Sequence, residues 1–557
     1  MYSVKYLLLL CFSLNLTTLF CQITEHEKNE NFIKIWGLLK YHHPEISNGK
    51  FDFNADFIKE YQKLKTIKSK EEFSKEMIQW IEIYGLKNLK IKENPYTKTL
   101  FTKNVSFEWI NSSGFSPKLS EILNNLKNNI KYNNYYAKVK KLSSSIDFSN
   151  DSPLPGFDAL KKEHRLLFLA SFWNAMHYWN VNIYLTDVPW KNVLRESLSD
   201  FNETGKENFE KAKEKLFSKL NDSHSDYPYS HTLTSIDKYP NFGGRIINDS
   251  LVITTIFNEK EFDEENLTIG DIIYTINNTN IKDFYQNKYS ATISASNKNY
   301  LKRAIERTYL LASNHDSIAV QILKKNGENV AQYIKLSALK YPAEKYVRLR
   351  APISENWKEL TPRIGYINLN TIDKKGLTTA FDKFENSKGI VIDLRNYPTN
   401  ITAFDVAKHL YPKEKIFLKG LASVQPAYGK YDFKPALNII NNPFKVGKNT
   451  KNYYKGIVVL LVDRTTASKA EWIGMAIQAS PNCTTIGEQT FGAVMNRNTI
   501  KLLDATTIDF TGVGAFYPND EGVQRKGLKL DLEIKEKALN YDDNLYIATA
   551  IKLINDN

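Results

Sequence analysis

Ser468 lies in a sequence pattern that could present a serine nucleophile. An unbroken apolar run, Gly456–Val462, has the length of a buried strand and leads through a short polar turn to this serine. A helix pattern with apolar residues such as Trp472 and Met475 follows it. Such a turn exposes the hydroxyl, and the start of the helix offers free N–H groups to a developing oxyanion. An ordinary helix N-cap serine has the same pattern, so both interpretations stay open at this point.

His224 is a candidate general base. It follows Ser223 in a polar run at the end of a helical segment. An imidazole titrates near neutral pH, so it can take a proton from a serine hydroxyl and return it to a leaving amine. A lone histidine in a loop is also commonly just a solvated residue, and the pattern alone does not decide between these roles.

The last third of the chain, 341–557, is predicted to be an α/β domain. Arg363–Leu369 and Gly389–Leu394 are mostly apolar runs of strand length, and the run before Ser468 is apolar without a break. Runs that are apolar throughout are typical of strands buried on both faces of a sheet. The strand that ends at Leu394 is followed by the polar segment Arg395–Pro398. These strands would position Ser468.

A small β domain is predicted over 236–340. Short β-rich runs occur at Ser250–Phe257, Asp271–Ile276 and Ser317–Leu323, with turn residues between them. The segment Leu267–Asn278 resembles the core signature of PDZ domains in bacterial proteases. The resemblance implies a module that binds an extended peptide as an added strand.

Within this domain, a short glycine-containing run is the candidate loop for a peptide carboxylate. It comprises Gly243, Gly244, Arg245 and Ile246. A plain hairpin turn explains the same run nearly as well.

The first third contains an internal repeat. Residues 31–85 and 168–224 share an aromatic spacing, in which Trp36 and Trp173 are each followed 17 positions later by another aromatic residue. Apolar positions recur at intervals of three and four, which favours amphipathic helices. The sequence therefore predicts an N-terminal helical domain over 22–150 and a second helical unit over 151–235, which carries Ser223 and His224.

The N-terminal segment 1–21 is typical of a secretory signal peptide, with Lys5 ahead of two apolar runs. Cleavage after Cys21 would start the mature chain at Gln22, and a lipid-modified Cys21 is the weaker alternative. The mature chain would keep only Cys483, so no intramolecular disulfide is expected. We therefore expect a periplasmic or secreted protein with no later membrane span.

Composition excludes several functional classes. The chain has 557 residues and a formal net charge of +13, but its lysines are scattered and form no basic block, so nucleic acid is not an expected partner. His42 and His43 lack further ligands at metal spacing. No phosphate loop or dinucleotide fingerprint is present, and no cofactor or metal is expected.

Three further motifs identify a family resemblance. Thr466–Glu471, Ile486–Gly492 and Lys388–Asn396, together with the tail Gly512–Ile534, resemble the S41 family of serine peptidases, of the C-terminal processing and tricorn-core type. The order of helical lobe, PDZ-like domain and α/β core is also that of the family. The resemblance implies a ClpP/crotonase-like peptidase core with Ser468 as the nucleophile.

Departures from the family pattern indicate a particular mechanism. In the Ser-Lys branch a lysine follows the Phe-Gly pair, but here that position is Ala493. The tricorn-like branch instead uses a histidine from the lobe ahead of the PDZ domain, and Ser223-His224 lie where that match places it. The resemblance therefore favours a Ser-His pair.

The resemblance also implies groups that assist the pair. A carboxylate after the Phe-Gly pair would orient the histidine: Glu521 is the nearest carboxylate, while Gln524 is closer to the expected spacing and cannot balance an imidazolium charge. Glu471 is a second candidate, although a helix-surface or helix-dipole role fits it equally well. The oxyanion hole is expected from the backbone amides of Lys469 and Thr399.

The sequence thus predicts an exported serine endopeptidase that acts on peptides or unfolded proteins through an acyl-enzyme on Ser468. The alternative is a peptidase fold with a decayed site that only binds peptides, suggested by Ala493, Gln524 and the absence of a Gly-Gly pair after Pro398. An interaction scaffold built from the helical repeat is a third, weaker hypothesis.

Overall fold

A computed structural model defines two compact units of the chain. It describes residues 22–92, 103–140, 143–151, 153–225, 227, 236–257, 264–308, 310–338, 355–423, 431–434 and 444–557. The first unit comprises the described residues up to Ala212, with those in Ala422–Phe433 and Asn498–Ile508, and the second comprises the others. The predicted signal peptide, 1–21, lies outside the described residues. None of the helices in the described part is long and apolar enough to cross a bilayer.

The first unit is mainly helical, as the aromatic spacing predicted. Its regular elements, with α9 continuing into the second unit, are α2 (Glu25–His42), α3 (Phe53–Leu64), α4 (Lys70–Ile83), α5 (Trp109–Ser112), α6 (Pro117–Lys127), β1 (Lys138–Val139), β2 (Ile146–Asp147), α7 (Lys162–Trp179), the 3-10 turn Ile183–Leu185, α8 (Trp190–Asn202) and α9 (Lys206–Ser218).

The predicted repeat corresponds to two helix triplets, α2-α3-α4 and α7-α8-α9, in which the same tryptophan contact recurs. Trp36 Nε1 in α2 donates to the carbonyl oxygen of Phe53 at 3.2 Å, and Trp173 Nε1 in α7 donates to that of Trp190 at 3.0 Å. Both bonds span 17 positions and fix the first helix of a triplet on the second.

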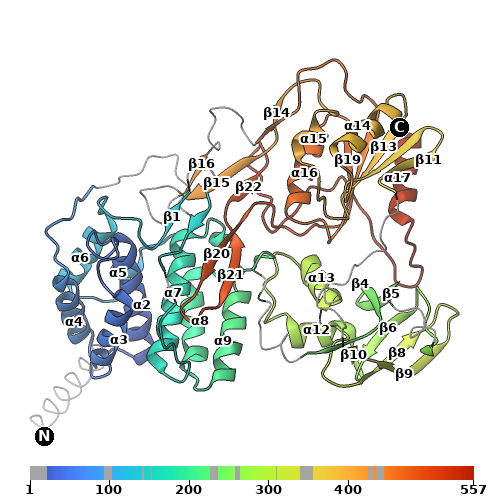
Figure 1. Cartoon of the computed structure of the whole chain (residues 1–557). Coiled ribbons are helices and arrows are strands. Elements are labelled where there is room, and N and C mark those ends of the chain that lie inside the picture. Colours follow the sequence, from blue (N-terminus) through green and yellow to red (C-terminus); the bar gives the residue numbers. More distant parts are fainter. Residues whose placement is uncertain are drawn as a thin grey trace, which may run out of the picture. The chain divides into compact units, whose positions relative to one another are not determined.

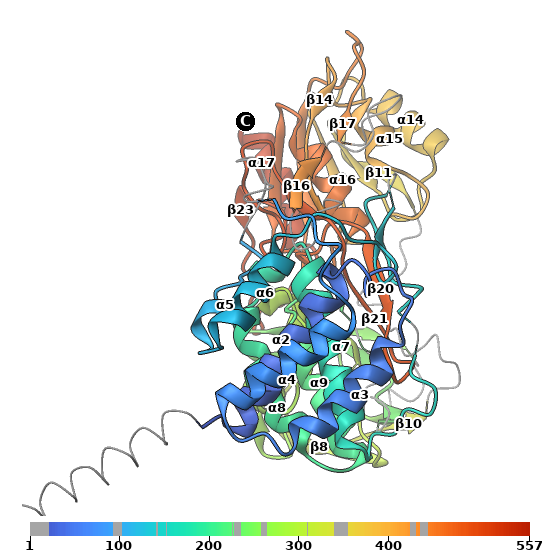
Figure 2. The ribbon, with the colours of Figure 1, turned by 90° about the vertical axis from the view of Figure 1, so that its left-hand side faces the viewer.

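The two triplets meet along α2 and α7, which lie side by side in Figures 1 and 2. Equivalent positions touch each other: the Tyr41 and Tyr178 rings are 5.2 Å apart. The contacts of Tyr41 with Trp179 and of His42 with Tyr178 are reciprocal. Reciprocal contacts between equivalent residues are the signature of a two-fold interface, here within one chain.

The small β domain lies in the second unit and is an antiparallel sheet of order β4-β5-β6-β8-β9, with β7 paired to β6. The three predicted strands are present, within one residue at their ends. Its elements are β3 (Lys238–Tyr239), β4 (Phe242–Ile247), β5 (Ser250–Ile256), β6 (Ile272–Ile276), β7 (Thr279–Asn280), α12 (Ile281–Tyr289), α13 (Lys298–Thr308), β8 (Ser317–Leu323), β9 (Asn329–Lys335) and β10 (Ser337–Ala338).

The α/β domain is built on a sheet of order β11-β12-β13-β18-β19-β23, in which all neighbours except the β11–β12 pair are parallel. The elements of this domain, some of which extend into the first unit, are β11 (Trp357–Thr361), β12 (Ile364–Asn368), α14 (Lys374–Lys383), β13 (Gly389–Asp393), α15 (Ala403–Ala407), β14 (Lys415–Ile416), β15 (Lys419–Ser423), β16 (Tyr431–Lys434), β17 (Lys445–Val446), β18 (Ile457–Val462), α16 (Lys469–Gln478), β19 (Cys483–Gly487), β20 (Arg497–Lys501), β21 (Thr507–Thr511), β22 (Gly514–Phe516), β23 (Leu532–Glu533) and α17 (Leu545–Asp556).

The central strands β13 and β18 are buried on both faces, which explains why their sequences are mostly apolar. Ile392 of β13 packs in one core with α16, while its neighbour Val391 packs in another core with α17. The alternation follows from the two-residue period of a strand. Because the strands are parallel, the segments after β13, β18 and β19 all leave the same edge of the sheet. Thr399, Ser468 and Ala493 lie on these three segments.

Candidate active site

Ser468 sits at the start of α16 in a strained backbone conformation. Its φ is 51° and its ψ is −109°, a combination that residues with a side chain rarely adopt. The turn before it is fixed by Thr466, whose Oγ1 accepts from the Asp463 amide at 3.0 Å and donates to the Leu394 carbonyl at 3.1 Å. Strain that the surrounding contacts maintain is characteristic of functional turns.

Glu471 joins this turn to the segment after β19. Its buried carboxylate accepts from the Ser468 amide at 3.2 Å, from Thr490 Oγ1 at 2.6 Å and from the amides of Gly492 and Ala493 at 2.7 and 3.1 Å. Burial raises the pKa of Glu471 to about 7, against the lowering effect of these hydrogen bonds. Glu471 is therefore a buried link rather than a helix-surface residue.

Ala493 occupies the position where the Ser-Lys branch carries its lysine. Its side chain is fully buried in a small apolar cluster with Ala467, Tyr300 and Phe491. The side-chain surroundings of Ala493 are therefore those of an aliphatic group.

His224 packs against Phe491 of the segment after β19, and Thr511 contacts its imidazole. Its Nδ1 is 2.9 Å from Thr511 Oγ1, and its ring packs on Phe491 at 5.6 Å between centroids. The histidine is only 8% exposed, and this burial lowers its pKa, while the Asp222 charge acts in the opposite direction.

Phe491 connects the surroundings of the two predicted catalytic residues. Its amide donates to the Thr466 carbonyl at 3.0 Å, and its ring packs with Ala467, next to Ser468. The contacts of the described residues thus reach from Ser468 to His224 through Phe491, without a direct hydrogen bond between the Ser468 hydroxyl and the imidazole. Catalytic hydrogen bonds are often long in unliganded enzymes.

The carboxylate beside His224 comes from Asp222, which the sequence analysis did not assign. Asp222 Oδ1 accepts from Thr511 Oγ1 at 2.8 Å and from the His224 amide at 3.1 Å, and Oδ2 accepts from the Thr511 amide at 2.5 Å. Asp222 was visible in the sequence two positions before His224. Thr511 carried no signal, because it is 287 positions away from the histidine that it contacts.

Gln524 belongs to the same cluster, whereas Glu521 does not. Gln524 is buried, and its Nε2 is 3.3 Å from Thr511 Oγ1 and 3.5 Å from Asp222 Oδ1. Glu521 instead forms an ion pair with Lys529 at 2.5 Å, which lowers the pKa of Glu521, and its side chain is 38% exposed. The prediction that Glu521 orients His224 is therefore wrong in this structure.

Ser223 anchors the histidine loop. Its Oγ donates to the Phe491 carbonyl at 3.1 Å and accepts from the Ser296 amide at 3.0 Å, while its own amide donates to Ser296 Oγ at 2.9 Å. All three groups are buried. Ser223 therefore bonds Ser296 and Phe491 and not the imidazole. The side chain that contacts the imidazole Nδ1 is Thr511.

Of the two predicted oxyanion donors, Lys469 keeps a suitable position and Thr399 does not. Lys469 is the first residue of α16, where amides have no partner within the helix. The Thr399 amide donates to the Asn370 carbonyl at 2.9 Å. Because that amide is already used, Thr399 does not complete the predicted oxyanion hole.

The predicted carboxylate loop is a buried strand. Gly243, Gly244, Arg245 and Ile246 all lie in β4 and pair with β5, for example Arg245 with Val252. Arg245 is 1% exposed and forms ion pairs with Asp463, Glu488 and Glu536 at 3.2, 2.6 and 2.8 Å. Since Arg245 is neutralised inside the protein, the run is not a free anion-binding loop, and this prediction is corrected.

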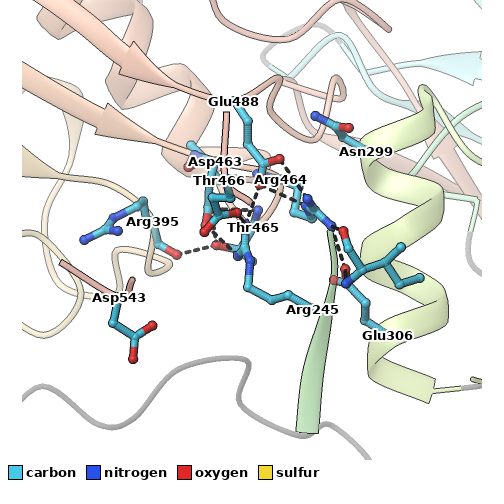
Figure 3. Close-up of polar contacts among 12 residues, drawn as sticks. Arg245, Asn299, Glu306, Arg395, Asp463, Arg464, Thr465, Thr466, Glu488 and Asp543 are labelled. Atoms are coloured by element: carbon cyan, nitrogen blue, oxygen red, sulfur yellow. Dashed lines mark hydrogen bonds and ion pairs between the residues drawn. The ribbon is translucent and has the colours of Figure 1, made fainter. Parts of the chain in front are cut away.

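The outer edge of β4 is occupied by side chains (Figure 3). The Ile246 amide donates to Glu306 Oε1 at 2.5 Å, and its carbonyl accepts from Arg464 Nη1 at 3.1 Å. Arg464 also pairs with Glu306 at 2.5 Å and Glu488 at 2.9 Å. An added peptide strand would need these same backbone groups of Ile246, and Arg464 stands four residues before Ser468.

Comparison with known proteins finds that part of the chain is similar to a known family. Residues 363–534 match peptidase family S41. The carboxy-terminal processing protease CtpA of Bacillus subtilis (strain 168) is 28% identical over 185 residues, which are 32% of this chain and 36% of CtpA. The match thus spans about a third of the length of that curated relative.

Two solved structures share the fold. The structure of mature CPAF complexed with lactacystin has a TM-score of 0.55 at 12% identity, covering 71% of this chain and 99% of that one. The crystal structure of mature CPAF has a TM-score of 0.54 at 11% identity, covering 71% and 98%. At this identity the similarity concerns the multidomain α/β fold alone.

Proposed function

We propose that this chain, whose residues 363–534 match peptidase family S41, is a serine peptidase that hydrolyses peptide bonds with Ser468 as its nucleophile. The carrying observation is the position of Ser468: inside the matched segment, at the exit of a parallel strand, with a φ of 51° at the start of a helix. Strained residues at such turns are over-represented among catalytic groups.

The chemistry follows from the groups at hand. Ser468 Oγ attacks the substrate carbonyl carbon, its proton passes to His224 Nε2, and the C=O electron pair moves to the oxygen. The Lys469 amide then donates to that oxyanion. As the C–N bond breaks, the proton on His224 passes to the leaving amine. A water molecule then gives a proton to His224 and attacks the acyl-enzyme, and that proton returns to Ser468 Oγ as the acid leaves.

His224 rather than a lysine is proposed as the base. Ala493 removes the lysine of the Ser-Lys branch, and its apolar cluster adjoins Ser468. His224 is buried against Phe491 and has its Nδ1 engaged by Thr511, which leaves Nε2 for the serine. An imidazole with its other nitrogen held in this way is the usual partner of a serine nucleophile.

We further propose that the substrate is an exported or unfolded polypeptide, with segment 1–21 as the export signal. A periplasmic or secreted location follows from that proposal, with a lipid anchor at Cys21 as the alternative. The small β domain, proposed to be PDZ-like, would contribute to handling of extended peptides.

Labelling with a fluorophosphonate tests the nucleophile. The purified chain is expected to be labelled on Ser468 and to cleave an unfolded, fluorescently tagged protein. Ser468→Ala should lose both, while Ser290→Ala, at an exposed serine on the surface of the same unit, should lose neither. Equal labelling and cleavage by Ser468→Ala and the parent would refute the assignment.

A decayed, peptide-binding site is the second candidate, and it is favoured by the occupied Thr399 amide. In that case the chain would bind the tagged unfolded protein without cleaving it, and fluorophosphonate would not label Ser468.

A further inference from the structure

We propose that Thr511 and Asp222 are positioning residues that hold the proton of neutral His224 on Nδ1 and leave Nε2 as the base. The inference rests on the proposed function for its catalytic meaning. Its structural content is a relay of buried groups in the order His224, Thr511, Asp222, in place of a direct contact between the imidazole and a carboxylate.

The direction of the relay follows from counting protons. A hydroxyl has one hydrogen to donate, and an ionised carboxylate can only accept. Thr511 Oγ1 lies 2.8 Å from Asp222 Oδ1, so the hydroxyl proton points to Asp222. At 2.9 Å from His224 Nδ1, the same oxygen must therefore accept, and Nδ1 must carry the proton. A neutral imidazole then has its lone pair on Nε2.

Asp222 is held in place by groups that only a carboxylate satisfies. It accepts from the His224 amide, the Thr511 amide and the Thr511 hydroxyl. Ser294 fixes its backbone, with Oγ accepting from the Asp222 amide at 3.0 Å and donating to its carbonyl at 2.9 Å. Asp222 and Thr511 are 3% and 0% exposed, so water does not compete for these bonds.

At the position where the family resemblance implies a carboxylate, the chain has the neutral side chain of Gln524, and its contacts explain why. Its Nε2 donates toward both Thr511 Oγ1 and Asp222 Oδ1. A glutamate there would lack that donor and would place a second negative charge beside Asp222. The charge that balances an imidazolium comes from Asp222, so the glutamine does not mark a weakened site.

Charge on His224 is governed by a small set of neighbours. Asp222 and Asp509 favour the imidazolium, Arg497 opposes it, and Arg497 and Asp509 pair with each other at 2.9 Å. Thr511 and Phe491 are uncharged. Asp222 is therefore the anion through which the relay stabilises the charged histidine.

The tautomer is tested directly by NMR of the full chain labelled with ¹⁵N-histidine. The chain has nine histidines, and the His224→Gln variant identifies the signal of His224. At neutral pH we expect Nδ1–H and an unprotonated Nε2. Thr511→Val, which has no hydroxyl, should lose the preference for Nδ1–H, and Thr511→Ser should keep it. A proton on Nε2 in the parent protein would overturn the inference.

The catalytic meaning is tested by the rate of fluorophosphonate labelling. Thr511→Val should slow labelling of Ser468 by about 100-fold, and Thr511→Ser should recover it to within about tenfold. Asp222→Asn should also move the acid limb of the pH–rate profile to lower pH by about one unit, because the imidazolium loses its anion. A purely structural role would leave that limb in place. Circular dichroism and thermal melting of each variant check that it folds.

The two proposals fail in different ways. If the parent protein is not labelled on Ser468, the proposed function fails, and the NMR tautomer still decides on the relay. If the parent is labelled but Thr511→Val labels at the same rate, the relay has no catalytic role and only the function survives.

Discussion

At the scale of the residue, Glu471 shows how one buried carboxylate can hold two segments of a site together. It accepts from the Ser468 amide, from Thr490 Oγ1, and from the amides of Gly492 and Ala493, which lie 21 and 22 positions after Glu471. Four donors compensate only part of the cost of burying this group, since its pKa is still raised to about 7.

This shift predicts a pH dependence of stability. The folded chain holds the Glu471 proton up to about pH 7, whereas the reference value for this side chain is 4.5. For an acid whose pKa is raised on folding, stability is present at low pH and is lost as the pH rises through about 7. The free energy of unfolding of the parent protein, relative to that of Glu471→Gln, should therefore decrease between about pH 4.5 and 7.

Urea denaturation over this pH range measures the effect. Glu328→Gln, at an exposed glutamate, is the control and should leave the pH dependence unchanged. If the parent and Glu471→Gln differ by a constant amount across the range, Glu471 does not titrate as described.

At the scale of the element, the crossing of α2 and α7 depends on a glycine. A Cβ added at Gly37 would lie 1.8 Å from Asn174 Oδ1, and Asn174 Nδ2 donates to the Ile33 carbonyl of α2 at 3.0 Å. Trp36 and Trp173 are equivalent in the repeat, so Gly37 and Asn174 are equivalent positions that face each other.

Gly37→Ala is accordingly expected to destabilise the first unit by about 2 kcal/mol, since overpacking forces the helices apart. Asn174→Ala should make room for the new methyl group and recover part of that loss in the double variant. Thermal melting of the parent, the two single variants and the double variant measures the coupling. Additive losses would contradict the close approach.

At the scale of the whole molecule, the second unit joins its small β domain to its parallel sheet through buried ion pairs. Arg245 of β4 reaches Asp463 and Glu488, while Arg464 reaches Glu306 of α13 (Figure 3). Removing one member of such a cluster leaves buried polar groups with fewer partners, which is more costly than the loss of a surface pair.

Glu306→Ala is predicted to lower the stability of the second unit by about 1 to 3 kcal/mol, because the Ile246 amide loses its acceptor and Arg464 keeps only Glu488. Glu306→Gln, which can still accept from that amide, should cost less. Glu328→Ala, an exposed control in the same domain, should be nearly neutral. Chemical denaturation measures all three, and a neutral Glu306→Ala would show that the cluster does not join the two domains.

Local patterns predicted many of the helices and strands, and they placed Ser468 at a turn between a strand and a helix. The apolar runs that became β13 and β18, the aromatic spacing of the helix triplets and the turn before Ser468 are all encoded within short windows of sequence. A strand buried on both faces has a mostly apolar sequence, and an amphipathic helix has apolar residues at intervals of three and four, so both can be recognised in the sequence. The signal peptide, the PDZ-like character and the Ser-His mechanism stay predictions.

The partners of His224 were decided by the tertiary structure alone. Thr511 reaches Asp222 from 289 positions away, and no local pattern distinguishes it from other polar residues. Gln524, a candidate through the family resemblance, contacts Asp222 from 302 positions away. For the same reason the sequence leaves Glu521 and Gln524 as alternatives. It also does not show that Arg245, in the candidate loop Gly243–Ile246, is paired inside a buried cluster. Sequence determines which side chains are available and which segments form strands and helices, because those depend on near neighbours. Which polar atoms meet, and whether an amide such as that of Thr399 is free, depends on how distant segments pack, and only the folded chain sets that.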